Sequence, residues 1–182
     1  METFISILRG INVSGHKSIQ MTDLKTLYAE LGLKEAITYI QSGNVIFKTE
    51  VKISNQRLSA KIEQAIHKKY NFDVPVIIRT IEEIKHAISV NPFLKETNID
   101  LERVHVTFLA ENPEQHSAES IRDLDYSPDK FMVIGKEIYL YCPNGYGTTK
   151  LSNTFFEHKL KVSATTRNWK TVNKLVELAG NH

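Results

Sequence analysis

The chain has 182 residues, of which 41% are hydrophobic and 24% are charged, so it can bury a core without disulfides as one domain or two small ones. Cys142 is the only cysteine, which excludes an intramolecular disulfide and favours a reducing, cytoplasmic location. The net charge of +2 favours no class of partner, and without a signal-peptide pattern or about 18 consecutive apolar residues we expect neither secretion nor a membrane span.

In the first half of the chain, segments with the hydrophobic spacing of strands alternate with segments that have the spacing of helices. Apolar runs rich in β-branched residues predict strands, apolar residues three or four apart predict helices, and Ser42-Gly43-Asn44 is typical of a tight hairpin turn. The expected elements are, in chain order, strand 4–9, helix 21–31, strand 37–41, strand 45–49, helix 58–70 and strand 74–79.

This β-α-β-β-α-β order is that of the ferredoxin-like arrangement, in which two helices cover one face of a four-stranded antiparallel sheet. Thr80 and Glu83 form a capping-box pattern that opens a further helix, and Asn91-Pro92 stops it. The segment 91–102 is mostly polar and contains turn-forming Asn, Pro and Asp residues. We therefore expect a first domain over residues 1–91 and a second over residues 92–182.

The second half begins with the same order. A strand at 103–110, a helix after Pro113 and two strands at 131–134 and 137–142 predict a second β-α-β-β unit. Two helices are expected after it, and no final strand is evident. The expected fold class is α+β: two tandem ferredoxin-like (βαββαβ-type) α/β sandwiches, the second incomplete with extra C-terminal helices.

Three polar segments lie at the ends of expected elements: LRGINVSG at 8–15, QSGNV at 41–45 and TTRNW at 165–169. There, backbone and side-chain donors can converge on a ligand. An arginine beside a flexible loop can present its planar donors to a carboxylate or phosphate. The candidate ligand-binding residues are Arg9, Gly10, Asn12, Gly15, Lys17, Ser42, Asn44, Lys150, Arg167 and Asn168.

Each candidate also has a purely structural interpretation. The loop 10–18 approaches a phosphate-binding loop, but His16 intervenes before Lys17 and the helix begins too late, so a glycine-dependent turn is favoured. Arg9 and Asn12 equally fit a structural ion pair or a loop cap, and a hairpin turn by itself favours the residue types of 42–44. Trp169 fits a core position of the last helix.

No catalytic residue, metal ligand or cofactor is assigned. The seven histidines show no ligand spacing on one helix: His16, His67, His86, His105, His116, His158 and His182. Cys142 alternates with Tyr139 and Tyr141 in a β-prone run, which is typical of a small buried apolar residue.

The strings LRGINVSG, YIQSGNVIF, NPF and TTRNWKTVNKL occur in this order over nearly the whole chain. Together they resemble the bacterial family "domain of unknown function 1697". The resemblance implies a cytosolic bacterial protein of ferredoxin-like build, with no established reaction or cofactor. Family members often show Gly-Gly in the first loop and Ser-Lys-Leu near the end, where this chain has Ser14-Gly15 and Thr149-Lys150-Leu151.

Three functions remain open. The preferred one is binding of nucleic acid or a phosphorylated or anionic ligand, because residues 145–182 carry six basic residues against two acidic ones. The second is an enzyme acting on a small polar substrate, which Arg9 would orient and for which His16, Lys17 or Cys142 would have to supply the base or nucleophile. The third is a protein-interaction module that forms homo-oligomers through an open sheet face.

Overall fold

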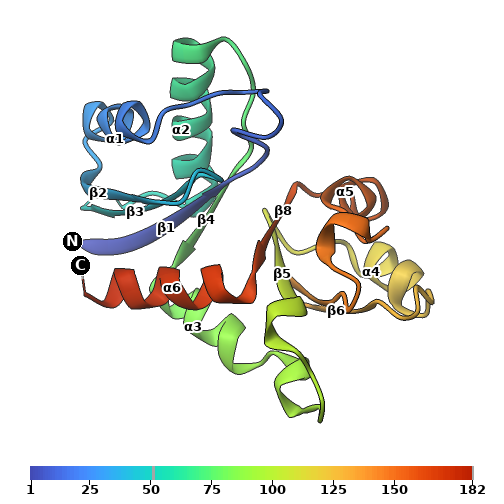
Figure 1. Cartoon of the computed structure of the whole chain (residues 1–182). Helices are drawn as coiled ribbons and strands as arrows, with labels where there is room; N and C mark the ends of the chain where they lie inside the picture. Colours follow the sequence, from blue (N-terminus) through green and yellow to red (C-terminus); the bar gives the residue numbers. More distant parts are fainter. Residues whose placement is uncertain (51, 182) are drawn as a thin grey trace. The chain divides into compact units, whose positions relative to one another are not determined.

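The computed structural model describes residues 1–50 and 52–181, which divide into two compact units. Unit 1 comprises residues 1–85 and the chain from Leu175 on, and unit 2 comprises residues 86–174. The elements of unit 1 (Figure 1) are β1 (Glu2–Leu8), α1 (Met21–Glu30), β2 (Lys34–Tyr39), β3 (Asn44–Thr49), α2 (Asn55–Tyr70) and β4 (Val76–Thr80).

The sheet of unit 1 has the strand order β2-β3-β1-β4, with every neighbouring pair antiparallel. The helices α1 and α2 cover one face (Figure 1), where side chains from both helices and the sheet form a common core. Ser6 is a polar residue in this core, and its hydroxyl lies 2.7 Å from the hydroxyl of Tyr28. Because β1 is central, all its residues from Phe4 to Leu8 are buried.

The capping box expected at the start of α3 (Ile81–Ser89) is confirmed. The Glu83 backbone N–H donates to Thr80 Oγ1 at 3.1 Å, and the Thr80 N–H donates to Glu83 Oε2 at 2.9 Å. The helix ends before Asn91, whose side chain accepts a hydrogen bond from the backbone N–H of Phe93 and so begins a short 3-10 turn, η1 (Pro92–Lys95). A second such turn, η2 (Leu101–Arg103), precedes the strand β5 (Val104–Leu109).

Unit 2 repeats the element order of unit 1. Its elements are β5 (Val104–Leu109), α4 (Gln115–Arg122), β6 (Lys130–Ile134), β7 (Glu137–Tyr141), η3 (Tyr146–Thr148), α5 (Asn153–Leu160) and β8 (Ala164–Asn168), after which α6 (Trp169–Gly180) begins. The strand order is β6-β7-β5-β8, again antiparallel throughout. Phe156 and Leu160 of α5 and Ile121 of α4 pack against the sheet in one core.

The expectation that unit 2 lacks a final strand is wrong, because β8 forms at Ala164–Asn168 and pairs with β5 over five residues. The segment ATTRN gives no apolar alternation, so its sequence does not indicate a strand. The pairing is stabilised by tertiary contacts instead: Thr107 Oγ1 lies 2.6 Å from Thr166 Oγ1, which donates to Asn153 Oδ1 at 2.7 Å.

The two units also match at the start of their second helix. Ser54 caps α2 by accepting a hydrogen bond from the backbone N–H of residue 57, and Ser152 caps α5 in the same way from residue 155. Each serine is followed by an asparagine, Asn55 or Asn153, which begins the helix.

A second match anchors the last strand of each unit. Glu63 Oε1 accepts a hydrogen bond of 2.8 Å from the backbone N–H of Val76, the first residue of β4. Glu157 Oε1 accepts one of 3.0 Å from the N–H of Ala164, the first residue of β8. The two units therefore share equivalent hydrogen bonds at matching positions, although they share no continuous string of identical residues.

The α+β class is confirmed by these two four-stranded antiparallel sheets and their helices. Within the described residues, none of the helices is long and apolar enough to cross a membrane.

Candidate functional site

The loop between β1 and α1 carries five of the expected site residues, and Asn12 holds it in shape. The Asn12 side chain donates to the backbone O of Ile19 at 3.0 Å and of Gln41 at 2.8 Å, and its Oδ1 accepts from the Ile19 N–H at 2.9 Å. This loop therefore lies beside the turn that follows β2. The Asn12 amide is committed to that contact, as the structural interpretation of the sequence requires.

Arg9 is half-buried directly after β1, and its backbone N–H donates to the Pro75 O at 2.9 Å. The glycines Gly10 and Gly15 have positive φ angles of 71° and 76°. The Lys17 Nζ donates to the backbone O of Asp73 at 2.5 Å, which links the loop to the connection between α2 and β4. The Lys17 ammonium group is thus hydrogen-bonded within unit 1.

The turn between β2 and β3 is packed rather than open. Asn44 is fully buried, and its side chain donates to the Tyr39 O at 2.9 Å and to Ser42 Oγ at 3.3 Å. Gly43 has a φ of +81°, and a Cβ there would lie 2.6 Å from Ile11 Cδ1. The structure thus places Ser42 and Asn44 in the hydrogen bonding of the turn itself.

The other three expected residues lie in unit 2. Arg167 is 8% exposed and donates to Thr165 Oγ1 at 3.0 Å and to the Thr166 O at 2.9 Å. Burial lowers the pKa of Arg167 to about 10, with the charge of Tyr146 opposing, so its guanidinium stays protonated at neutral pH. Asn168 accepts a hydrogen bond of 2.8 Å from the Thr171 N–H and so caps α6.

Lys150 is exposed and lines a pocket of about 430 Å³ in unit 2. Two carboxylates, of Asp125 and Asp129, line the same pocket. The hydroxyl and backbone N–H of Ser127 both donate to Asp125, and these bonds hold the pKa of Asp125 below its usual range. Lys150 therefore faces a pocket in which negative charge predominates.

The residues at 1–50 and 52–181 contain no group of three or more His, Cys, Asp or Glu side chains arranged to hold a metal ion. His182, one of the seven histidines considered above, lies outside the described residues.

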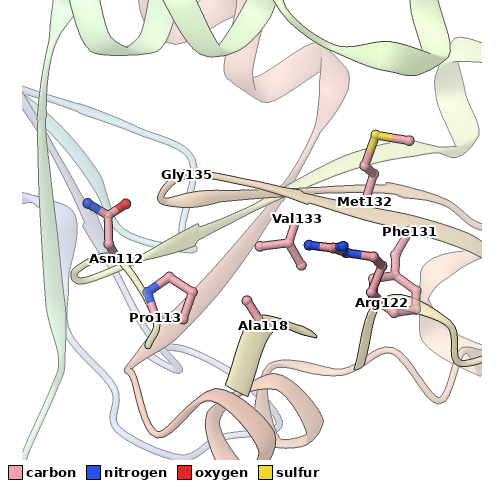
Figure 2. Close-up of a pocket in the computed structure, with 8 residues that line it drawn as sticks. All are labelled: Asn112, Pro113, Ala118, Arg122, Phe131, Met132, Val133 and Gly135. Atoms are coloured by element: carbon pink, nitrogen blue, oxygen red, sulfur yellow. The ribbon is translucent and has the colours of Figure 1, made fainter. Parts of the chain in front are cut away.

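A pocket that the sequence did not predict lies between α4 and β6 of unit 2, with a volume of about 480 Å³ (Figure 2). We call it the α4–β6 pocket. Most of its lining is apolar, and the residues are Asn112, Pro113, Ala118, Arg122, Phe131, Met132, Val133 and Gly135.

Arg122 is the charged residue of this lining. Ala118 and Arg122 share one face of α4 because they are four residues apart. In Figure 2 the Arg122 side chain extends along the pocket toward Val133. The lining includes no acidic side chain, and within the described part of the chain no ion pair or hydrogen bond engages the Arg122 guanidinium. The spacing of Ala118 and Arg122 was visible in the sequence, but the pocket depends on how α4 packs beside β6.

The fold and these sites define an α+β protein with two antiparallel sheets and solvent-open pockets. The chain belongs to the family described as "Protein of unknown function (DUF1697)", whose model matches residues 1–139. This confirms the resemblance seen in the sequence.

The chain also has a similar solved structure, described as that of conserved bacterial protein SP0830 from Streptococcus pneumoniae. The two chains are 21% identical, the match covers 98% of each, and the TM-score is 0.76. At this identity the likeness shows the fold alone. No curated protein matches the chain.

Proposed function

We propose that this protein binds a small organic anion with an apolar part in the α4–β6 pocket. The observation that carries the proposal is Arg122, an exposed arginine that pairs with no carboxylate of residues 1–50 and 52–181 and lies in a mainly apolar lining. An arginine guanidinium presents parallel donors to a carboxylate or phosphate, and here it lies beside apolar side chains that can contact the rest of a ligand. Phe131 and Val133 supply the apolar contact, and the volume is in the range of small-ligand sites.

Calorimetric titration with 3-phenylpropionate, phenyl phosphate and the neutral 3-phenylpropanol tests this proposal. We expect at least one of the two anions to bind, and the alcohol to bind about tenfold more weakly or not at all. Comparing the two anions distinguishes a carboxylate site from a phosphate site.

Arg122→Gln should remove the preference for the anion, whereas Arg57→Gln, at an exposed arginine of α2, should leave it unchanged. Equal binding of anion and alcohol, or an anion preference that survives Arg122→Gln, would contradict the proposal.

Binding of nucleic acid or a phosphorylated ligand through Arg9, Lys17, Lys150 and Arg167 is a second proposal, supported by the exposed Lys150. It is weaker because Lys17 and Arg167 donate hydrogen bonds within their units and because Asp125 and Asp129 repel phosphate at the Lys150 pocket. Polarisation with mixed oligonucleotides should show affinity that falls with salt if it holds. Absence of salt-dependent binding would end it.

For the architecture, we propose that both units are ferredoxin-like and arose as a tandem pair, with the boundary at residues 91–92. The identical element and strand orders and the matched hydrogen bonds of Glu63 and Glu157 support this proposal. Limited proteolysis of the full chain tests the boundary, because a boundary at residues 91–92 predicts that the first cleavage falls in the polar segment 91–102 and not inside either unit.

A further inference from the structure

The α4–β6 pocket opens along the edge of a sheet. In the order β6-β7-β5-β8, β6 has a partner on one side only. Successive side chains of a strand point to opposite faces, yet Phe131, Met132 and Val133 all line the pocket. A pocket that reaches three consecutive residues must include the strand edge itself, where every second residue of β6 turns its N–H and C=O away from β7.

The β6 edge is regular and apolar. It pairs with β7 at each position from Lys130 to Ile134 without a register shift. Met132, at the middle of the strand, is 47% exposed, and the one charged residue of the strand, Lys130, is bonded to Glu96 at 2.8 Å. Such an edge is a template for a further strand.

The corresponding edge of unit 1 is protected. The pairing of β2 with β3 shifts register between Lys34 and Ile37, and Glu35 has a positive φ of 53°. Glu35 is also paired with Lys48 at 2.6 Å. Irregular backbone and charged side chains are the usual means of preventing strand addition. Unit 1 has both at β2, whereas the described strand β6 has a regular backbone and one charged side chain, Lys130, at its first position.

The two ends of the pocket differ in chemistry. Figure 2 shows Phe131 and the start of the Arg122 side chain at one end, Asn112, Pro113 and Gly135 at the other, and the Arg122 guanidinium beside Val133 between them. Phe131 is near the start of β6 and Gly135 follows its end. A strand that pairs antiparallel with β6 would therefore run from Asn112 toward Phe131, so a chain that ends opposite Val133 places its C-terminal carboxylate at the Arg122 guanidinium.

We propose that the α4–β6 pocket binds the C-terminal segment of a peptide, which adds to β6 as an antiparallel fifth strand and places its carboxylate on Arg122. This inference rests on the proposed anion site and names its ligand class. Main-chain hydrogen bonds to β6 provide affinity, and the apolar lining selects small or β-branched side chains at alternate positions. The guanidinium selects a free carboxyl terminus over an amidated one.

Fluorescence polarisation tests the proposal with an N-terminally labelled peptide, Gly-Ser-Thr-Val-Thr-Val, carrying a free C-terminus. Two matched peptides serve as controls, one with a C-terminal amide and one N-methylated at alternate residues on the edge that would pair with β6. We expect each control to bind about tenfold more weakly. Arg122→Gln should weaken the free acid to the level of the amide and leave the amide unchanged, whereas Arg57→Gln should change neither.

The outcomes separate this inference from the proposed function. If 3-phenylpropionate binds in an Arg122-dependent way but the peptide does not bind, or binds equally when N-methylated, strand addition is overturned and the anion site remains. If neither the small anions nor the peptide binds, both fall. If the chain dimerises in sedimentation experiments and the free peptide does not bind the dimer at all, the occupant of the edge is a second copy and the peptide proposal is overturned.

Discussion

The carboxylate of Glu63 accepts its 2.8 Å hydrogen bond from the backbone N–H of Val76 while half-buried beneath the start of β4. Burial raises the pKa of Glu63 above its ordinary value of 4.5, the bond from Val76 opposes the shift and the charge of Asp73 adds to it. The anionic form is thus the disfavoured one in the folded state, even though it anchors a strand.

This relationship predicts how stability depends on pH. Because the folded-state pKa is raised, native protein keeps a proton that the unfolded chain has released, so stability falls as pH rises from 4.5 to the raised value. Glu63→Gln keeps an acceptor for Val76 and removes the charge. In urea titrations, its free energy of unfolding should therefore increase relative to wild type as the pH rises above 4.5, the ordinary pKa of a glutamate. Glu102→Gln, at an exposed position, should show no such trend, and a parallel response of both variants would contradict the prediction.

Gly43→Ala should destabilise the protein by about 2–4 kcal/mol, because the added Cβ combines a left-handed backbone with overpacking. The Cβ would lie 2.6 Å from Ile11 Cδ1 and 2.9 Å from Leu8 Cβ. Gly15→Ala is the matched control, since φ there is +76° and nothing lies within 4 Å, and it should cost only about 1 kcal/mol. Thermal and urea unfolding measure both, and equal losses would show that the contact with Ile11 is unimportant.

Asn12→Gly should lower the free energy of unfolding by about 2 kcal/mol, because the three hydrogen bonds of the Asn12 side chain are lost while glycine accepts its φ of 55°. Asn12→Ala should cost more, since alanine adds backbone strain. Ser18→Ala, in the exposed part of the same loop, is the control and should change stability little. If Asn12→Gly has no effect on stability, the side chain does not hold the loop and the turn after β2 together.

Cys142 should be unreactive in the native protein. It is fully buried, and burial raises the pKa of its thiol to about 11, with a hydrogen bond to Thr149 opposing and the charge of Asp129 adding. A thiol-specific chromogenic disulfide at pH 8 should therefore label native protein slowly and guanidinium-unfolded protein completely. Rapid stoichiometric labelling of the native state would show that the thiol is accessible.

The first unit was predictable from local patterns because its elements agree with their own sequences. The apolar run of β1, the helical spacing in α1 and α2, and the Thr80–Glu83 capping box each specify their structure within a few residues. The family resemblance was predictable for the same reason, since its strings are local.

The candidate site was less predictable. The polar side chains of Asn12 and Asn44 predict ligand contacts, but the structure shows those amides bonded to backbone oxygens at Gln41 and Tyr39. A sequence lists donors and acceptors but does not say which are satisfied by the fold. Arg122 was not predictable, because one arginine on a short helix carries no sequence signal of a binding site.

The sequence by itself determined the family, the α+β class and the order of elements through β7, because local periodicity and turn residues encode them. Only the tertiary structure decided that Ala164–Asn168 forms β8, that Glu63 and Glu157 anchor matching strands, and that Arg122 lies beside the open edge of β6. Each of these depends on pairing between residues distant in the chain, where burial and hydrogen-bond satisfaction outweigh local propensity.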